Sequence, residues 1–368
     1  MTAALRIGVD GRAFASPAGG IRRYVFELYA ALATVAPEAD VVAIGAPAGL
    51  VLPPRVRRRG ALPFPTNLGW MAASLPLAVR GAGLSVFHAP AYKAPLWGVH
   101  PQVVTIHDVS YERKPEWDAY RNDRLRRAFY RRGALAADRV VTDSSFSRDE
   151  IVAAYGIDPR RITVVPLAAS TVFAPGPCDA TALPPGVRQP YALHVGDLHV
   201  RRNLSTAVAA LLDLRRGGSA LHLVCAGIDR GIGGGLRAAT AADPDALVLT
   251  GPVDERALVN LYRGAALLVY PSMYEGFGLP VLEAMQSGVP VVAANRASVP
   301  EVAGDAALLL DATDVRAWRA AIELVSRDTA AQARLRDAGV ARAAQFSWAR
   351  TARETLAVFQ QAAAGAFG

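Results

Sequence analysis

Lysine and cysteine are scarce in this sequence of 368 residues, and long apolar runs are missing. The two cysteines have no CxxC or zinc-ligand spacing, and Cys225 lies in the apolar run LHLVCAGI, which is typical of a core residue. A disulfide framework is therefore not expected, and the expected compartment is a reducing cytoplasm. No run approaches the roughly 20 apolar residues of a membrane span, and the start MTAALRIGVDG is not that of a signal peptide. We expect a soluble protein.

The net charge of +8 lies entirely in the first half of the chain. The first 173 residues carry 22 Lys and Arg against 14 Asp and Glu, with arginine runs at 55–60 (RVRRRG) and 124–132 (RLRRAFYRR). One interpretation is a solvated, arginine-rich surface. The other is a surface that meets anionic membrane lipid or a phosphate-bearing acceptor. A nucleic-acid partner is not expected, because no recognised module and no interleaved aromatic residues accompany the charge.

Short β-rich runs alternate with helical stretches along the chain, which predicts parallel sheets of α/β type. Such runs occur in the first half as RIGVDG, DVVAIGA, SVFHAP, QVVTIHD, RVVTDS and ITVVPL, and in the second as YALHVGD, ALHLVCAGI, ALVLTGPV, ALLVYPS and PVVAAN. The proline-rich stretch 174–190 between them predicts a linker. We therefore predict two Rossmann-like domains, at 1–173 and 191–346, that face each other across a cleft and bind ligands at the carboxyl ends of their strands. A final amphipathic helix at 347–368 begins at a Ser347 cap.

The stretch EGFGLPVLE at 275–283 follows a predicted strand and opens a predicted helix. Pro280 suits the first turn of that helix, and Gly276 and Gly278 let a ligand approach its backbone N–H groups. Carboxylates accept hydrogen bonds from the vicinal hydroxyls of a sugar ring. The pattern therefore predicts sugar hydroxyls at Glu275 and Glu283 and a phosphate between them; for either acid alone, an exposed side chain is the simpler interpretation.

A second polar segment, HVGDLHVRRN at 194–203, also follows a strand and precedes a helix. Arg201, Arg202 and Asn203 lie just before that helix, and a guanidinium can bind two phosphate oxygens at any working pH. We expect phosphate binding here; the alternative is an ordinary pair of surface arginines.

The first half carries weaker signals. Gly19 and Gly20 open a helix and predict a second N–H cradle, and His107-Asp108 ends the strand of TIHD. His107 alone could equally be a hydrogen-bonded residue without a functional role, and His88 is a weaker candidate of the same kind. Three basic residues are expected on the acceptor side: Arg12, Arg22 and Lys93.

Taken together, these segments resemble the retaining, nucleotide-sugar-dependent glycosyltransferases of family 4, which have the two-domain GT-B fold. The resemblance covers nearly the whole chain, from IGVDGR and GGIRRY through TIHD, RVVTDSSFSRDEI and VGDLHVRRNL to YEGFGLPVLEAMQSGVPVVA and ASVPEVAGDAALLLD. Its most specific mark is the acid pair that encloses GFGLP. It implies that the last helix crosses back to the N-terminal domain.

The resemblance also implies roles for single residues. Glu283 matches the acid at the nucleotide ribose, Glu275 the acid near the donor sugar, and Arg202 the position, usually lysine, beside the diphosphate. His107, Glu275 and Arg202 are the expected catalytic residues. The expected donor-binding residues are Gly20, Gly196, Arg201, Arg202, Asn203, Val253, Glu275, Gly276, Phe277, Gly278, Leu279 and Glu283. Family members often have arginine where this chain has Asp197, so the phosphate charge of that position is missing.

The expected activity is that of a retaining hexosyltransferase that needs no metal and no cofactor besides a GDP- or UDP-sugar co-substrate. GGIRRYVFEL, TIHD and EVAGDAALL look most like bacterial mannosyltransferases of surface-polysaccharide assembly, so we favour GDP-mannose as donor and a saccharide or lipid-linked acceptor. The basic first half would suit peripheral contact with the inner face of the membrane. Two alternatives remain: a nucleotide-sugar epimerase of the same fold, and a nucleotide-sugar-binding protein without transferase activity.

Overall fold

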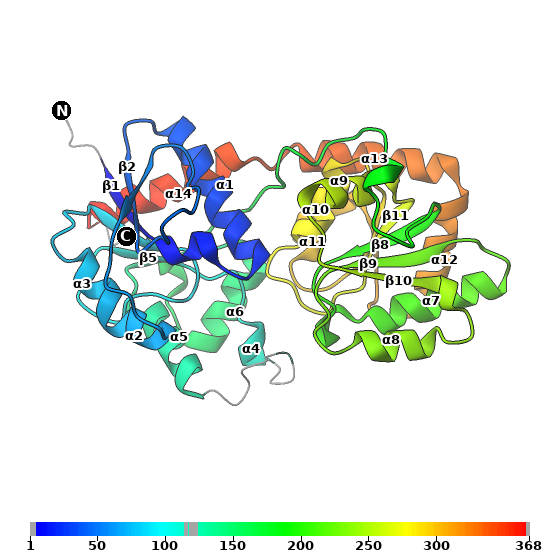
Figure 1. The fold of residues 1–368 in the computed structure, drawn as a ribbon, viewed down its shortest axis with the longest axis horizontal. Coiled ribbons are helices and arrows are strands. Elements are labelled where there is room, and N and C mark those ends of the chain that lie inside the picture. The colour runs from blue at the N-terminus through cyan, green and yellow to red at the C-terminus, as the bar shows by residue number, and fades with distance from the viewer. Residues whose placement is uncertain (1–4, 114–116, 118–123, 366–368) are drawn as a thin grey trace. The chain divides into compact units, whose positions relative to one another are not determined.

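The computed structural model describes residues 5–113, 117 and 124–365. The chain forms two units: Met1–Leu167 together with Ser347–Gly368, and Ala168–Phe346. Each unit contains one parallel sheet with helices packed around it (Figure 1). The two Rossmann-like sheets that the strand pattern predicts are thus confirmed. No helix in the described part of the chain combines the length and the apolar composition that crossing a bilayer requires.

The first unit has a seven-stranded sheet in the order β3-β2-β1-β4-β5-β6-β7. Its strands are β1 (Arg6–Asp10), β2 (Asp40–Ile44), β3 (Val56–Arg59), β4 (Val86–Ala89), β5 (Gln102–Thr105), β6 (Arg139–Thr142) and β7 (Ile162–Val164). The chain changes direction across the sheet between β1 and β4, which pair in parallel. Ligands of open parallel sheets bind outside the carboxyl ends of the strands at such a point.

Helices of the first unit pack around this sheet. They are α1 (Gly19–Val35), α2 (Asn67–Gly69), α3 (Leu75–Val79), α4 (Ser110–Arg113), α5 (Arg124–Ala136), α6 (Ser145–Tyr155) and α14 (Trp348–Ala363). Short helical turns lie at Gly11–Ala15, Trp70–Ser74 and Pro159–Arg161.

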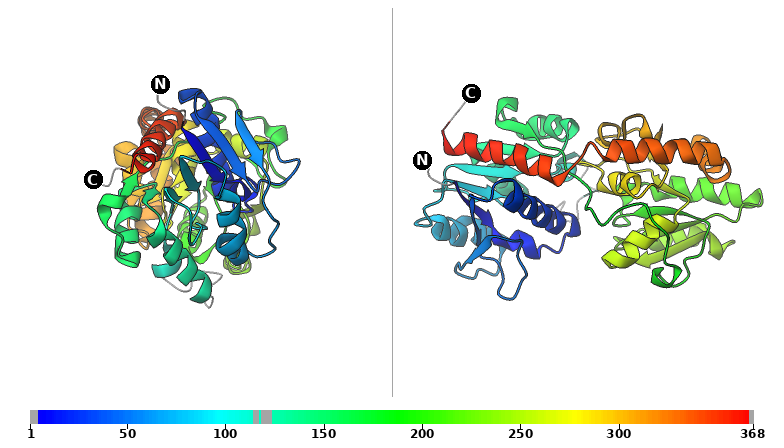
Figure 2. Two further views of the ribbon diagram at one scale, coloured as in Figure 1. Left: turned by 90° about the vertical axis from the view of Figure 1, so that its left-hand side faces the viewer. Right: turned by 90° about the horizontal axis from the view of Figure 1, so that it is seen from above.

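The C-terminal helix α14 packs beside α1 in the first unit, and Figure 2 shows it in red along that unit. Ser347 caps it by accepting a hydrogen bond from the N–H of Arg350, as the sequence predicts. Trp348 lies 6.4 Å from Tyr24 between ring centroids, and Thr351 donates to the carbonyl of Pro166. The prediction that the last helix returns to the N-terminal domain is therefore confirmed.

The second unit has a six-stranded parallel sheet in the order β10-β9-β8-β11-β12-β13. Its strands are β8 (Tyr191–Val195), β9 (His222–Ala226), β10 (Leu247–Gly251), β11 (Leu267–Tyr270), β12 (Val291–Ala294) and β13 (Leu308–Leu310). Its helices are α7 (Leu204–Arg216), α8 (Gly233–Ala239), α9 (Glu255–Gly264), α10 (Leu279–Gln286), α11 (Val299–Ala303), α12 (Val315–Arg327) and α13 (Thr329–Ala343). Three-residue turns lie at Ala180–Ala182, Val200–Arg202, Pro244–Ala246 and Gly304–Ala306.

The central strands of both sheets are buried on both faces, which explains their nearly continuous apolar runs. β11 and β12 are fully buried along their length, and Trp318 from α12 fills the core of the second unit. With the strands fixed in this way, the loops that follow them at the carboxyl edge are the parts of each unit available for chemistry.

Three segments differ from the sequence-based expectation. The arginine run at 55–60, where no strand was predicted, contains the edge strand β3; Arg57 and Arg58 are exposed there, and Nε of Arg57 lies 2.9 Å from Oδ1 of Asp40. The strand β13 was not predicted. Residues 174–190, expected to be a linker, belong to the second unit, where the N–H of Asp179 donates to Asn260.

Candidate functional site

In the second unit, the segment after β8 holds a pair of arginines at the carboxyl edge of the sheet. Gly196 follows β8 with a φ of 130°, and Arg201 and Arg202 end the turn Val200–Arg202. Asn203 then adopts a φ of 50° and donates from its side chain to the carbonyl of Ala312, which fixes the start of α7. A Cβ at Gly196 would lie 3.3 Å from Nη2 of Arg202, so glycine lets the guanidinium lie against the backbone.

Arg202 is the most deeply placed cation of this edge. Its side chain is 11% exposed and forms an ion pair with Glu275. Its Nη1 donates to the hydroxyl of Tyr270 at 2.6 Å, while its Nε has no hydrogen-bond partner among the described residues. Burial lowers the pKa of Arg202, but a guanidinium stays charged at any working pH. The sequence therefore correctly indicated an arginine at a strand end, but not that an acid already neutralises it.

Glu275 lies in the loop after β11 and is almost fully buried. Besides pairing with Arg202, its carboxylate accepts a hydrogen bond from Ser272. Ser298 holds the same loop from the other side, donating to the carbonyls of Glu275 and Phe277 at 2.9 and 2.8 Å. The loop that carries the first acid is therefore rigidly held by two serines.

The helix α10 begins where EGFGLPVLE predicts it to begin. Gly278 is its N-cap with a φ of 112° and, as a glycine, supplies no side-chain hydrogen bond to the helix, and Pro280 lies in its first turn. Glu283, one turn inside, is buried and accepts a hydrogen bond from the hydroxyl of Tyr262 at 2.8 Å. Gly276, Phe277, Gly278 and Leu279 thus lead into a helix N-terminus that favours an anion.

Two further features border this edge of the second sheet. Val253 follows β10, directly before Asp254 caps α9. Asp197 follows Gly196 and pairs with Arg230, whose Nε lies 2.9 Å from Oδ2. Arg230 was not predicted, although its place shortly after β9 is the same signal that singled out Arg202. The negative charge at position 197 is therefore neutralised by Arg230.

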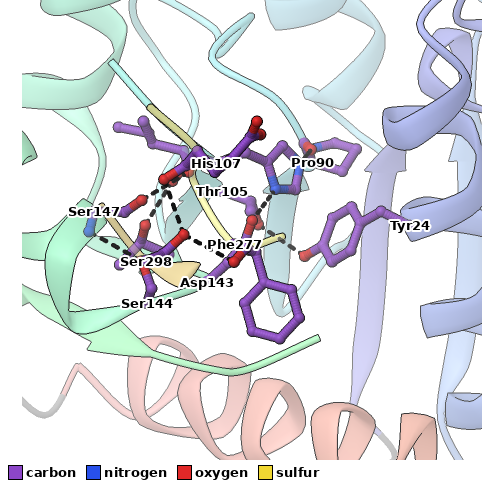
Figure 3. A network of polar contacts seen from close by, with 12 residues as sticks. Tyr24, Pro90, Thr105, His107, Asp143, Ser144, Ser147, Phe277 and Ser298 are labelled. Carbon is purple, nitrogen blue, oxygen red and sulfur yellow. Dashed lines mark hydrogen bonds and ion pairs between the residues drawn. The ribbon is translucent and has the colours of Figure 1, made fainter. Parts of the chain in front are cut away.

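In the first unit, His107 is held by contacts to four neighbours (Figure 3). Its ring Nδ1 lies 2.7 Å from Oδ2 of Asp143, and Nε2 lies 3.2 Å from the carbonyl oxygen of Pro90. The hydroxyl of Ser147 donates to the main-chain carbonyl of His107. The ring of Tyr24 meets the imidazole edge to face, with 4.7 Å between centroids.

Both ring nitrogens of His107 thus face acceptor oxygens, which favours a doubly protonated ring. Burial opposes the charge, but the nearby carboxylate of Asp143, with a smaller effect of Asp108, raises the pKa of His107 above its ordinary value. Asp143 was missed by the sequence analysis. It directly follows β6, the parallel neighbour of β5 that leads to His107, so its position at a strand end was the available signal.

His88, the weaker candidate, belongs to the core. It lies in β4, fully buried, with Nδ1 2.8 Å from the hydroxyl of Tyr29 and Nε2 2.8 Å from Oγ1 of Thr105. Burial lowers the pKa of His88 to about 3, so its ring is neutral at physiological pH. These contacts support a structural role for this histidine.

The expected acceptor-side residues lie at different places of the first unit. Gly20, which was expected to bind the donor, lies in the first turn of α1, where a helix start was predicted, and it is exposed. Arg22 is exposed and donates to the main chain of Ser16. Arg12 follows β1 and Lys93 follows β4, so these two share the carboxyl edge of neighbouring strands.

Comparison with known proteins agrees with this architecture. Residues 18–173 match the family described as Glycosyltransferase Family 4, and residues 181–342 match the one described as Glycosyl transferases group 1. A sucrose-phosphate synthase from Thermosynechococcus elongatus has a similar fold, with a TM-score of 0.79 at 21% identity over 98% of this chain and 100% of that chain.

Two curated relatives are similar in sequence. The D-inositol 3-phosphate glycosyltransferase of Nocardia farcinica is 32% identical over 61% of this chain and 53% of that protein, so the chain spans about half of its length. The O-antigen chain mannosyltransferase B of Escherichia coli is 31% identical over 75% of this chain and 74% of that protein. The chain belongs to the family 4 glycosyltransferases of the group 1 type and has their GT-B fold.

Proposed function

We propose that this glycosyltransferase moves a hexose from a nucleotide-sugar donor to a saccharide or lipid-linked saccharide, with retention of the anomeric configuration. The observation that carries the proposal is the buried pair of Arg202 and Glu275 in the second unit, on the strand-end loops that also lead into α10. A buried cation and a helix N-terminus suit a leaving diphosphate, and buried acids suit the hydroxyls of ribose and hexose.

The donor's nucleotide would bind the second unit. Arg202, with Arg201 and Asn203 beside it, would face the diphosphate, and Glu283 would accept hydrogen bonds from the ribose. Cleavage of the sugar–phosphate bond builds negative charge on the departing diphosphate. Arg202 and the N–H groups at the start of α10 would stabilise that charge electrostatically, so the proposal requires no metal ion.

His107 in the first unit would hold the donor sugar rather than take up a proton. Its two ring nitrogens already face Asp143 and Pro90, and its carbonyl receives the hydroxyl of Ser147. A group fixed in this way is pre-organised and loses little freedom when substrate binds. Retention would then follow from attack on the face that the diphosphate leaves, with the diphosphate as base.

Mannose is the sugar that the relatives favour. The mannosyltransferase from Escherichia coli covers most of this chain at 31% identity, and we therefore propose GDP-mannose as donor. A D-inositol 3-phosphate glycosyltransferase among the relatives supports a phosphate-bearing acceptor as well. The choice of donor rests on these relatives.

A screen of nucleotides tests the donor class. GDP and GDP-mannose should raise the melting temperature more than UDP, ADP or their sugars, since a ligand that binds only the folded state stabilises it by mass action. Released GDP and the product's anomeric configuration are then measured with mannosyl acceptors. Conversion of the donor sugar without acceptor would favour an epimerase, and nucleotide binding with no turnover for any acceptor would favour a binding protein.

The basic first unit supports peripheral contact with the inner face of the membrane. In α5, Arg124, Leu125, Arg131 and Arg132 are exposed, whereas Arg127 is occupied by its ion pair with Glu112. Vesicle binding should rise with the fraction of anionic lipid and fall with salt. Binding that ignores both variables, or that survives loss of Arg131 and Arg132 unchanged, would contradict this part of the proposal.

A further inference from the structure

Two basic side chains of the first unit lie at the carboxyl ends of neighbouring strands without a complete set of partners. Arg12 follows β1 and Lys93 follows β4, and these strands pair in parallel register from Ile7 to Val9. This is the point at which the strand order of the sheet changes direction. Parallel sheets bind their ligands at this kind of position.

Arg12 is fixed by neighbours that leave part of its guanidinium unused. The guanidinium lies over the ring of Trp70, with Cζ 5.0 Å from the centroid, and Nη2 donates to Oδ1 of Asn67 at 3.2 Å. Nη1 is buried and has no hydrogen-bond partner among the described residues. A buried, charged N–H group without an acceptor is costly, so its presence indicates a position for an acceptor that arrives with a ligand.

The neighbouring acid, Asp10, does not act as the acceptor for Nη1 of Arg12. Asp10 is buried, and its carboxylate accepts hydrogen bonds from the N–H of Arg12 and from Nε1 of Trp70, each at 3.1 Å. Burial also raises the pKa of Asp10, which reduces its value as a counter-charge. Its oxygens are thus directed to the backbone and to the indole rather than to the guanidinium.

Lys93 adds a second cation to the same place. It is partly buried, and no hydrogen bond or ion pair joins it to any described residue. Burial lowers the pKa of Lys93, the carboxylate of Asp10 opposes that effect, and Arg12 and Arg126 lower the pKa further by smaller amounts. The positive charges at this edge therefore repel one another in the ligand-free protein, and an anion would relieve that repulsion.

We propose that Arg12 and Lys93 form an anion subsite that binds a phosphate group of the glycosyl acceptor. Arg12 offers Nη1 as a directed donor, and Lys93 supplies a mobile point charge that can follow a phosphate oxygen. The inference rests on the proposed function only in calling the ligand an acceptor. The phosphate would belong either to a water-soluble sugar phosphate or to a pyrophosphate that links a saccharide to a lipid.

Binding of three probes to the full chain tests this subsite. With GDP at saturation, titration calorimetry compares mannose 6-phosphate, mannose, and a short-chain polyprenyl pyrophosphate in detergent. The phosphorylated probes should bind at least about tenfold more tightly than mannose. Lys93→Gln and Arg12→Gln should each abolish most of that difference, a loss of about 1.4 kcal/mol per tenfold. Arg80→Gln, which removes an exposed arginine elsewhere in the unit, should leave it unchanged.

The two phosphate sources are distinguished by which probe binds more tightly, and either result supports the subsite. Equal affinity for mannose and both phosphorylated probes would overturn it, as would an undiminished preference for phosphate in Lys93→Gln. Failure of the proposed function has a different signature. The unmodified protein would then show no stabilisation by any nucleotide, while the phosphate preference and its dependence on Lys93 could still be measured.

Discussion

The ion pair between His107 and Asp143 can be tested by one isosteric change, Asp143→Asn. The change keeps an oxygen next to Nδ1 of the imidazole but removes the negative charge that raises the pKa of His107 against the effect of burial. A raised pKa means that the fold stabilises the protonated ring. The stability gained from the pair is therefore complete below the ordinary histidine pKa of about 6.5 and is lost as the pH rises through the higher pKa of the folded protein.

The size of the effect follows from the geometry of the pair. A charge-assisted hydrogen bond contributes about 1.5–3 kcal/mol and a neutral one about 0.5–1.5 kcal/mol, so the substitution costs roughly 1–1.5 kcal/mol. The side chains of His107 and Asp143 are only 17% and 3% exposed, which limits screening by solvent. At 1.36 kcal/mol for each pKa unit, the pKa of His107 should fall by about one unit.

Two measurements check this value. NMR titration of the imidazole signals gives the pKa directly, with His107→Gln identifying the signal by its loss. The pH profile of kcat/KM should lose activity about one unit lower in Asp143→Asn. Asp108→Asn is the matched control, because Asp108 raises the pKa of His107 by charge without a hydrogen bond to the ring, and its shift should be smaller. An unchanged titration of His107 in Asp143→Asn would refute the reasoning, and a shifted titration with an unchanged rate profile would remove His107 from the reaction.

Four further substitutions concern the second unit. Glu283→Gln keeps the hydrogen bond from Tyr262 but should weaken GDP binding by about tenfold in calorimetry. Glu275→Gln should mainly lower kcat. If the two variants change the GDP dissociation constant and kcat equally, the roles assigned to the two acids are wrong. Arg202→Gln removes the positive charge, so kcat should fall by roughly 10–100-fold, and full activity would show that Arg202 is not at the leaving group. Arg230→Gln leaves the charge of Asp197 without its partner, so donor affinity should fall by about fivefold. The fall should be larger at low salt than at high salt, and a fall that does not depend on salt would exclude an electrostatic role of Arg230.

Local signals explain what the sequence predicted well. The start of α10 is determined by residues within one turn, where Gly278 takes a positive φ and Pro280 cannot donate a hydrogen bond. The start of α14 similarly depends on the hydroxyl of Ser347 reaching the N–H of Arg350. Alternation of apolar strands with helices was sufficient for the two parallel sheets, because burial on both faces leaves a clear composition signal. Such features need no knowledge of distant residues.

Contacts between distant segments explain what could not be predicted. Strand β3 carries three arginines, and only its pairing with β2, which brings Arg57 to Asp40, makes an edge strand of that sequence. Asp143 meets His107 because β5 and β6 are neighbours, 36 residues apart in the chain. A sequence pattern reports where strands end, but not which strand ends meet.

The same limit explains why the two acids of EGFGLPVLE differ more than their symmetry in the sequence implies. Glu275 contacts Arg202 from the end of β8, whereas Glu283 contacts Tyr262 from α9. Arg202 is therefore already neutralised by an acid when no ligand is bound, and a diphosphate must compete with Glu275 for it. Donor affinity then depends on the difference in free energy between the Arg202–diphosphate pair and the Arg202–Glu275 pair, not on the free energy of the first pair alone. Nε of Arg202, without a partner among the described residues, is the donor that a phosphate oxygen could take without breaking that pair.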